Sequence, residues 1–397
     1  MNFFSTYKKH QTDHLELDGV SYPKYVGEFW TPKQRQASSI HEISYRACFK
    51  AQLPNFFIEI FSKKGDVIYD PFSGRGTTVI EAALLERNVI ANDVNPLSRI
   101  LSSPRFFIPD TQEVEKRLSA IPFEKNERAD IDLSMFYHSK TESEIVGLKK
   151  YLKRRKRTGL EDDLDLWIRM VATNRLTGHS KGFFSVYTFP PNQAVGAERQ
   201  KLINKKRKQK PEYRDTKKII LNKSKQLIKD LASEDVQILR GIGKQAVFLN
   251  DDARSTKEIP SDHIQLTVTS PPFLNVVQYA DDNWLRFWFN DINAGVVAKK
   301  ITMSKTLKDW ADVMNGVFEE LFRITRKGGW IAFEVGEVKN AKIKLEEYVV
   351  PLGTEAGFEC KGIVINQQQF TKTSNIWGIK NNSKGTNSNR IVLFTKT

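Results

Sequence analysis

The fold of this chain is decided by the stretch Asp70-Pro71-Phe72-Ser73-Gly74-Arg75-Gly76-Thr77-Thr78, which joins a predicted strand to a predicted helix. Residues 66–69 before it form a short, mostly apolar run typical of a buried strand. Residues 77–86 after it carry apolar side chains on one face at helical spacing. Glycines at such a turn allow positive φ and let the backbone approach a ligand closely. The stretch therefore predicts one unit of a parallel α/β sheet, with a ligand beyond the carboxyl end of the strand.

The alternation of strands and helices extends on both sides of this unit and is interrupted once. We predict helices over residues 53–61 and 307–322, and strands over residues 88–91, 264–269, 330–335, 359–366 and 390–395, with the α/β pattern resuming at residues 247–252. The run Lys327-Gly328-Gly329 is expected to end the second helix. Residues 103–242 break the rhythm because they are polar and largely helical in pattern. The prediction is one open-sheet domain formed by residues 1–102 and 243–397, with residues 103–242 as a helical, basic insertion.

The glycine loop and the acidic residue after the next strand predict the kind of ligand. The loop lacks the Gly-Lys-Ser/Thr of a phosphate-binding loop and the third glycine of a dinucleotide fingerprint. Asp70 would repel a pyrophosphate but suits a cationic ligand, which favours S-adenosylmethionine with its ammonium and sulfonium groups. Asp93 lies seventeen residues after Gly76, where a carboxylate can accept hydrogen bonds from ribose hydroxyls. An ordinary tight turn is the alternative, since Gly-x-Gly alone is a weak signal.

A second candidate element, Ser270-Pro271-Pro272-Phe273, directly follows the predicted strand 264–269. Consecutive prolines fix φ and remove N–H groups while leaving their carbonyls as acceptors, so the loop forms a rigid pocket edge. Ser270 adds a hydroxyl, and Phe273 offers a flat surface on which an extruded base can stack. The lone pair of an aromatic amino nitrogen is delocalised into its ring, and acceptors for its N–H groups localise that lone pair for attack on a methyl sulfonium. The alternative is a structural Pro-Pro turn.

Positive charge is concentrated in one part of the chain. The formal net charge is +15, and residues 149–229 contain 23 Lys and Arg against 7 Asp and Glu, so the remainder is close to neutral. Such a segment can contact phosphate backbones through counterion release. The alternative is a solvated, lysine-rich helical surface.

Several other classes of protein are disfavoured by composition. No uninterrupted apolar run is long enough for a membrane span, and the N-terminal ten residues lack the apolar core of a signal peptide. The two cysteines, Cys48 and Cys360, cannot form a cysteine zinc site or a disulfide framework, and we expect no metal. The expected location is the cytoplasm.

The two motifs together resemble the DNA amino-methyltransferases, specifically their N4-cytosine branch. The resemblance covers about residues 44–99 and 250–397. It implies a Rossmann-like class I methyltransferase sheet of seven strands with the last one antiparallel. It also implies catalytic roles for Ser270, Pro271, Pro272 and Phe273. The residues that the resemblance assigns to the methionine part of S-adenosylmethionine are Asp70, Phe72, Gly74, Gly76 and Thr77. By the same resemblance Asp93 binds the ribose, and Asp252 lies near the adenine amino group.

The resemblance also implies a substrate. Serine before Pro-Pro is typical of N4-cytosine enzymes, whereas Asp or Asn is typical of N6-adenine enzymes, so N4 of cytosine in double-stranded DNA is preferred. A C5-cytosine enzyme is rejected because neither cysteine follows a proline. We expect the insertion to recognise and clamp the target DNA, and a cognate restriction endonuclease is a possible partner. N6-adenine methylation, RNA base methylation and an inactive DNA-binding module stay open, and the oligomeric state is not predicted.

Overall fold

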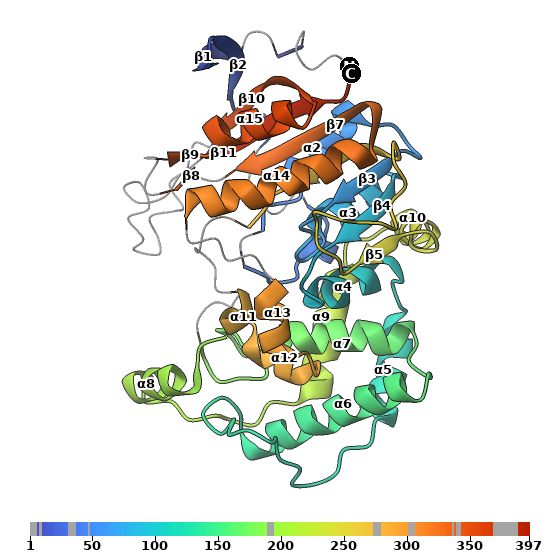
Figure 1. Cartoon of the computed structure of the whole chain (residues 1–397). Helices are drawn as coiled ribbons and strands as arrows, with labels where there is room; N and C mark the ends of the chain where they lie inside the picture. The colour runs from blue at the N-terminus through green and yellow to red at the C-terminus, as the bar shows by residue number, and fades with distance from the viewer. Residues whose placement is uncertain are drawn as a thin grey trace.

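The computed structural model describes residues 6–7, 10–30, 37–46, 48–188, 194–272, 279–300, 306–335, 337–338, 343–367 and 388–397 (Figure 1). The strands are β1 (Gln11–Leu17), β2 (Val20–Gly27), β3 (Val67–Asp70), β4 (Asn88–Asn92), β5 (Val247–Leu249), β6 (Ile264–Thr269), β7 (Thr325–Val335), β8 (Glu337–Val338), β9 (Ile343–Lys344), β10 (Glu359–Gln367) and β11 (Ser388–Thr395). The predicted strands are therefore all present, within a residue or two at most ends.

A nine-stranded sheet has the order β1-β2-β10-β11-β7-β6-β3-β4-β5. Strands β3 to β7 pair in parallel, and β11 is antiparallel to both β7 and β10. This confirms the predicted class I methyltransferase sheet, whose seven strands run from β10 to β5. The chain runs outward from β3 to β5 and then returns to β6 on the other side of β3. The switch point, where ligands bind in open α/β sheets, therefore lies between β3 and β6.

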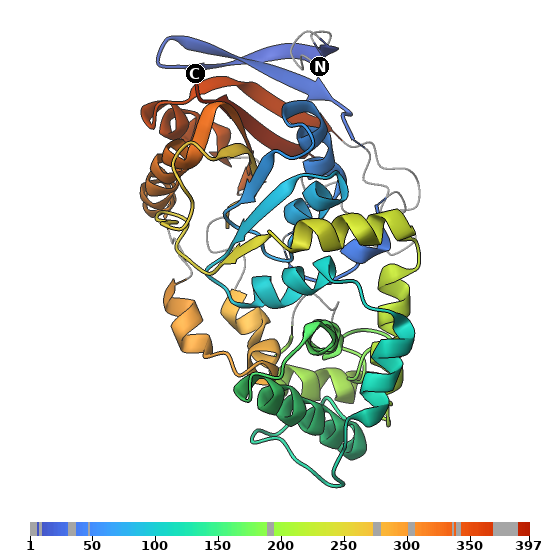
Figure 2. The same cartoon turned by 90° about the vertical axis from the view of Figure 1, so that its right-hand side faces the viewer.

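An N-terminal hairpin, which the sequence analysis did not predict, extends the sheet to nine strands. Strand β2 pairs in parallel with β10, and β1 pairs with β2 across the two-residue turn Asp18-Gly19. Both turn residues have positive φ, 49° and 77°, as a type I′ hairpin turn requires. Figure 2 shows this hairpin at the end of the sheet, next to the C-terminal strands.

The helices are α2 (Gln52–Phe61), α3 (Thr77–Leu84), α4 (Leu97–Ser102), α5 (Thr111–Ala120), α6 (Ser139–Arg157), α7 (Asp163–Arg175), α8 (Ala197–Arg207), α9 (Thr216–Ile228), α10 (Ser233–Gly243), α11 (Tyr279–Asp282), α12 (Trp284–Phe289), α13 (Ala294–Lys300), α14 (Leu307–Ile324) and α15 (Glu346–Glu355), with short 3-10 turns at Ser39–His41 and Ser103–Phe106. None of the helices in the described ranges is both long and apolar enough to cross a lipid bilayer.

Two apolar cores cover the two faces of the sheet. Ile68 of β3 packs with α2 and α3, whereas the next residue, Tyr69, faces α14 and α15, because successive strand side chains point to opposite faces. The first core continues into the helical part of the molecule and includes Trp167 of α7. This shared core attaches the helices to the α2 and α3 side of the sheet.

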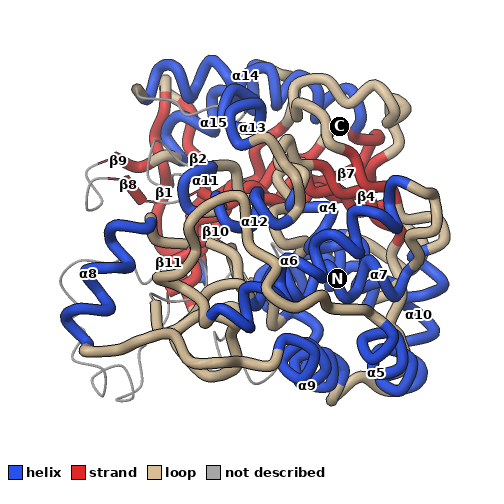
Figure 3. The backbone as a smooth tube through the Cα atoms, turned by 90° about the horizontal axis from the view of Figure 1, so that it is seen from below, coloured by secondary structure: helices blue, strands red, loops and turns tan. Residues whose placement is uncertain are grey.

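The helical part contains more of the chain than the predicted insertion. Helices α5 to α9 lie within residues 103–242, and α10 ends one residue beyond them, at Gly243. Helix α12, from the later half of the chain, packs against α7. Figures 1 and 3 show α11 to α13 beside the helices of that part. The division into residues 1–102, 103–242 and 243–397 stays a prediction about domains.

One predicted boundary is wrong. The helix α14 ends at Ile324, and Lys327-Gly328-Gly329 lies inside β7 rather than at the end of a helix. The pairing register between β6 and β7 shifts there, and Gly328 has φ 75°. The glycines therefore form an irregularity in the strand, a role that glycine often has within strands.

Candidate active site

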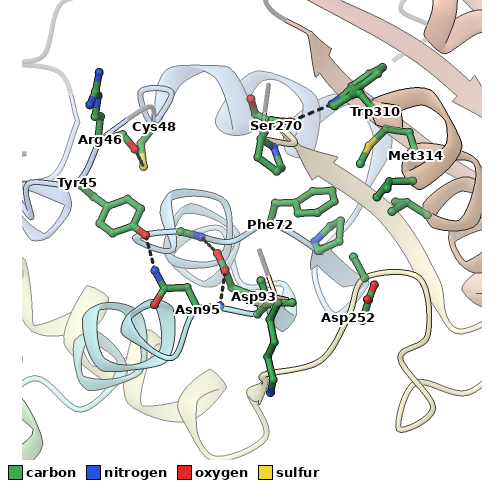
Figure 4. Close-up of a pocket in the computed structure, with 18 residues that line it drawn as sticks. Tyr45, Arg46, Cys48, Phe72, Asp93, Asn95, Asp252, Ser270, Trp310 and Met314 are labelled. Carbon is green, nitrogen blue, oxygen red and sulfur yellow. Dashed lines mark hydrogen bonds between the residues drawn. The ribbon is translucent and has the colours of Figure 1, made fainter. Parts of the chain in front are cut away.

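The glycine loop after β3 and the Ser-Pro-Pro element after β6 line one cavity (Figure 4). Strands β3 and β6 are neighbours, with Tyr69 opposite Thr267, so their carboxyl ends lie at the same edge of the sheet. The Thr269 hydroxyl donates a 2.7 Å hydrogen bond to the Asp70 carboxylate and ties the two strand ends together. The two motifs, which are almost two hundred residues apart in sequence, therefore share a single site.

The two glycines of the first loop have different surroundings. Gly74 has φ 51° and lines the cavity, and its N–H donates to the Asp93 carboxylate at 2.9 Å. Gly76, with φ 76°, precedes the first turn of α3 and is not among the residues that line the cavity. A Cβ at Gly76 would lie 2.5 Å from the Ser102 Cβ of α4, so this glycine allows two helices to pack closely.

The Asp93 carboxylate lies at the end of β4 and faces the cavity. It accepts hydrogen bonds from the N–H groups of Gly74 and Asn95, both at 2.9 Å. Burial raises the pKa of Asp93 to about 6, although these two hydrogen bonds favour the ionised form. A carboxylate held this way has lone pairs left for hydroxyl donors of a ligand.

Asp70 and Thr77 do not line the cavity. The Asp70 carboxylate accepts from the Thr269 hydroxyl and the Phe72 N–H, and burial raises its pKa to about 7. The Thr77 hydroxyl accepts a hydrogen bond from Arg75. Both residues hold the loop in shape, and their predicted contacts with a cofactor stay predictions.

Phe72 and Asp252 do line the cavity. The Asp252 carboxylate is engaged by Arg254 through two hydrogen bonds of 2.9 and 2.6 Å, and this pairing lowers its pKa. Both side chains are about half exposed, so the pair contributes little to stability. The N–H of its neighbour Asp251 donates to the Asn92 side chain at 2.9 Å.

The Ser-Pro-Pro element is fixed by groups that sequence reasoning did not single out. The Pro272 carbonyl, predicted to be free for a substrate, accepts a 3.0 Å hydrogen bond from the Trp310 indole. Ser270 hydrogen-bonds to Glu334 of β7, which also accepts from Asn389. Burial raises the pKa of Glu334 to about 7. Ser270 and Pro272 line the cavity, Pro271 is buried beside them, and Phe273 lies outside the described residues.

Several further residues complete the cavity wall. Tyr45 and Arg46 come from the segment before α2, Lys300 from the end of α13, and Met314 from α14. The Tyr45 hydroxyl accepts a 3.1 Å hydrogen bond from the Asn95 side chain. Met314 falls within the helix predicted over residues 307–322, but nothing in the sequence marked it or the other three as residues of the site. In the part of the chain that the structure describes, no cluster of His, Cys, Asp or Glu could hold a metal ion.

Comparison with known proteins finds related sequences. A family model described as DNA methylase matches residues 4–101, which contain the glycine loop and Asp93. The type II methyltransferase M.BsoBI of Geobacillus stearothermophilus is 44% identical over 72 residues, 18% of this chain and 14% of that protein. M.MvaI of Kocuria varians is 25% identical over 141 residues, 35% of this chain and 30% of that protein. The orphan methyltransferase M.BamHII of Bacillus amyloliquefaciens is 31% identical over 91 residues, 22% of this chain and 32% of that protein.

The matched segments thus span no more than about a third of these curated relatives. Among solved structures, a TehB-like S-adenosylmethionine-dependent methyltransferase from Corynebacterium glutamicum is 8% identical over 88% of this chain and 89% of that one, with a TM-score of 0.31. That likeness is too low to carry an argument.

The strand order and the loop at the switch point define a class I methyltransferase fold. Residues 4–101 match the DNA methylase family model, and short segments of the chain are similar to type II methyltransferases, which supports the predicted resemblance to DNA amino-methyltransferases. The cavity fits S-adenosylmethionine, the cofactor expected from the sequence. Asp93 is an acidic acceptor suited to ribose, Gly74 brings bare backbone to the cavity, and Phe72, Met314 and Val317 form an apolar wall suited to an adenine ring.

Proposed function

We propose that this chain transfers a methyl group from S-adenosylmethionine to the exocyclic amino group of a base in double-stranded DNA, with N4 of cytosine as the preferred target. The observation that carries the proposal is the common cavity of Gly74 and Ser270. A methyl donor held at the first loop and a base held at the second would meet there, and such a transfer depends above all on positioning. The base has to leave the helical stack to enter the cavity.

The residues of the second loop would prepare the amino group. When bound, S-adenosylmethionine supplies an electrophilic methyl group on a sulfonium. The Ser270 hydroxyl would accept a hydrogen bond from the amino group and so localise the nitrogen lone pair. Glu334, hydrogen-bonded to Ser270 and with a pKa raised to about 7, is suited to receive the proton that the nitrogen loses. The hydrogen bond from Trp310 to Pro272 holds the loop in place while this happens.

The preference for N4 of cytosine rests on the serine at position 270. A hydroxyl accepts an amino hydrogen bond without adding a negative charge to the cavity, and serine in this position is typical of the N4-cytosine branch. The matched family includes enzymes that act on adenine as well as on cytosine, so nucleoside analysis of the product has to decide between the bases.

The test compares Ser270→Ala with wild type and with Ser119→Ala, a control on the exposed surface of α5. Methylation of duplex DNA by labelled S-adenosylmethionine should fall by about 100-fold or more in Ser270→Ala, the size expected for loss of a group that assists proton transfer. The affinity for S-adenosylmethionine should stay within about twofold in both variants, since Ser270 would touch the base. Unchanged turnover in Ser270→Ala would refute the role of this loop.

Digestion of the product DNA and mass spectrometry of its nucleosides identify the base. N4-methylcytosine is the expected product. N6-methyladenine would refute the preference for cytosine and show that the enzyme methylates adenine. A structured RNA incubated in parallel separates an RNA base methyltransferase, and methylation of neither polymer would favour an inactive binding module. A cognate restriction endonuclease and a cytoplasmic location stay predictions that sequencing of the neighbouring genes and cell fractionation test.

A further inference from the structure

Helix α8 is packed differently from the other helices of the helical part. Gln200 is its one buried side chain, whereas α7 buries most of its residues. Leu202 in its middle is 59% exposed. Figures 1 and 3 show α8 at the margin of the molecule, away from the sheet. The helix therefore has little apolar packing to account for its position.

Amide side chains attach α8 through one face. The Gln200 and Gln209 side chains donate to the Tyr187 carbonyl at 3.0 and 2.9 Å, and the Asn204 side chain donates to the Met135 carbonyl at 2.7 Å. The Arg207 guanidinium lies 3.7 Å from the centre of the Tyr187 ring. Because these groups fix the helix, the exposed lysines at its end and just after it are not needed to hold it.

Those cations have no acidic partner in the part of the chain that the structure describes. Lys205, Lys206, Lys208 and Lys210 are all exposed, and no carboxylate of the described residues lies within 4.0 Å of their ammonium groups. The ion pair nearest to them on α8 joins Lys201 to Glu198. A run of unpaired cations on a projecting helix attracts an anionic polymer, since counterion release then adds to affinity.

Helix α6 carries an equally basic run, of which a part is paired. Lys149 and Lys153 pair with Asp291, Lys150 pairs with Glu127, and Arg155 pairs with Asp165. The end of α6 faces α5, because Asp165 also binds Arg117 of that helix. In Figure 1, α5 lies on the opposite side of the helical part from α8. Part of the charge on α6 is therefore neutralised within the protein. The exposed residues Arg154, Lys156 and Arg157 have no carboxylate of the described residues within 4.0 Å, but they lie at the end of α6 that faces α5, away from α8.

The residues just before α8 are connected to the cavity wall by hydrogen bonds and an ion pair. The N–H of Ala194, three residues before the helix, donates to the Asp282 carbonyl at 2.7 Å. The Asp282 carboxylate in turn pairs with Arg46, which lines the cavity. The Val195 carbonyl accepts from the Trp284 indole at 3.2 Å. A polymer bound along α8 would therefore lie next to the mouth of the site.

We propose that α8 and residues 208–210 form the arm that holds duplex DNA beside the cavity through its phosphates, and that α6 does not. The proposal rests on the proposed function and narrows the predicted DNA clamp to one element. Phosphate contacts of this kind set the position of the duplex and carry no base recognition by themselves.

The test replaces the four free lysines together, Lys205→Gln, Lys206→Gln, Lys208→Gln and Lys210→Gln. The matched control removes the same charge from the exposed end of α6: Lys153→Gln, Arg154→Gln, Lys156→Gln and Arg157→Gln. Binding to a labelled duplex of mixed sequence is measured by fluorescence anisotropy over a series of KCl concentrations. The slope of log affinity against log salt should fall by about 3 to 4 in the α8 variant and by less than about 1 in the control. Circular dichroism and S-adenosylmethionine affinity should be unchanged in both.

Equal slopes for the α8 variant and wild type, or a larger change in the control, would overturn the proposal. A change seen with structured RNA but not with duplex DNA would overturn it in favour of a different polymer. Methylation is measured separately in the same proteins. If the wild-type protein binds DNA through α8 but methylates no substrate, the proposed function is refuted and the role of α8 in DNA binding stands. If the wild-type protein is an active methyltransferase but the α8 variant has the same salt slope as wild type, the proposed function stands and the role of α8 is refuted.

Discussion

Replacement of Gly76 by alanine tests whether this glycine serves packing rather than cofactor binding. Its φ of 76° costs an alanine about 1–2 kcal/mol. The new Cβ would lie 2.5 Å from the Ser102 Cβ and 3.3 Å from the Arg105 guanidinium, and both side chains are fully buried. Overpacking of this kind costs about 1–3 kcal/mol. The unfolded chain loses some entropy with alanine, which offsets about 0.4–1 kcal/mol. The expected net loss of unfolding free energy is about 3 kcal/mol.

Gly65→Ala is the matched control, because its φ is 83° and nothing lies within 4 Å of the added Cβ. It should lose only about 1 kcal/mol, so that the difference between the two variants measures the clash. The double variant Gly76→Ala with Ser102→Gly should recover part of the loss because the opposing Cβ is gone. Urea unfolding followed by tryptophan fluorescence gives each value. Equal losses for Gly76→Ala and Gly65→Ala would refute the packing argument.

Gly74→Ala tests the glycine of the same loop that lines the cavity. Its added Cβ would meet Cys48 and Tyr45 at 3.6 Å, an ordinary van der Waals distance, but it would stand in the cavity that Gly74 lines. We expect S-adenosylmethionine affinity to fall by about 10-fold or more, at a stability cost of about 1–2 kcal/mol from its positive φ. Isothermal titration calorimetry measures the affinity. A Gly76→Ala protein that is folded at low temperature should keep its affinity.

Three further perturbations follow from the hydrogen bonds and pKa values of the site. If the ionised Asp93 carboxylate, with its pKa of about 6, binds the ribose, S-adenosylmethionine affinity should rise by up to about 10-fold from pH 5 to pH 7. Asp93→Asn should bind more weakly and show no such rise in a calorimetric titration. Trp310→Phe removes the donor to the Pro272 carbonyl, which should lower the unfolding free energy by about 1 kcal/mol and slow methylation in a radiolabel assay. The control Trp288→Phe loses a hydrogen bond to Asp130 outside the cavity and should leave the methylation rate unchanged. The folded protein holds a proton on Glu334 that the unfolded chain releases, since burial raises its pKa from 4.5 to about 7, so stability falls as pH rises between these values. In Glu334→Gln, the decrease in unfolding free energy from about pH 5 to about pH 8 should be smaller by about 2–3 kcal/mol than in wild type, as measured by urea unfolding at the two pH values.

The N-terminal hairpin shows how a local signal can be present and missed. Asp18-Gly19 lies between two short polar and apolar runs, and Asp-Gly is a strong sequence signal for a two-residue hairpin. The sequence alone was therefore sufficient to predict β1 and β2. Their attachment to β10 depends on a pairing between segments more than three hundred residues apart, for which no local pattern exists.

The order and type of the α/β elements were determined by the sequence alone, because the periodicity of apolar residues and the glycine turn at Gly74 act over a few neighbouring positions. The same short-range chemistry marked Asp93 and Ser270 as candidates for the site. Tertiary structure decided which residues meet: β6 returns beside β3, so that Ser270 faces Gly74, Trp310 reaches Pro272, and Glu334 reaches Ser270. It also decided that Gly76 contacts a helix rather than the cavity, and that four cations of α6 are paired while Lys205, Lys206, Lys208 and Lys210 have no acidic partner among the described residues. These contacts join residues far apart in the chain and depend on how the sheet and its helices assemble, which the pattern along one segment does not encode.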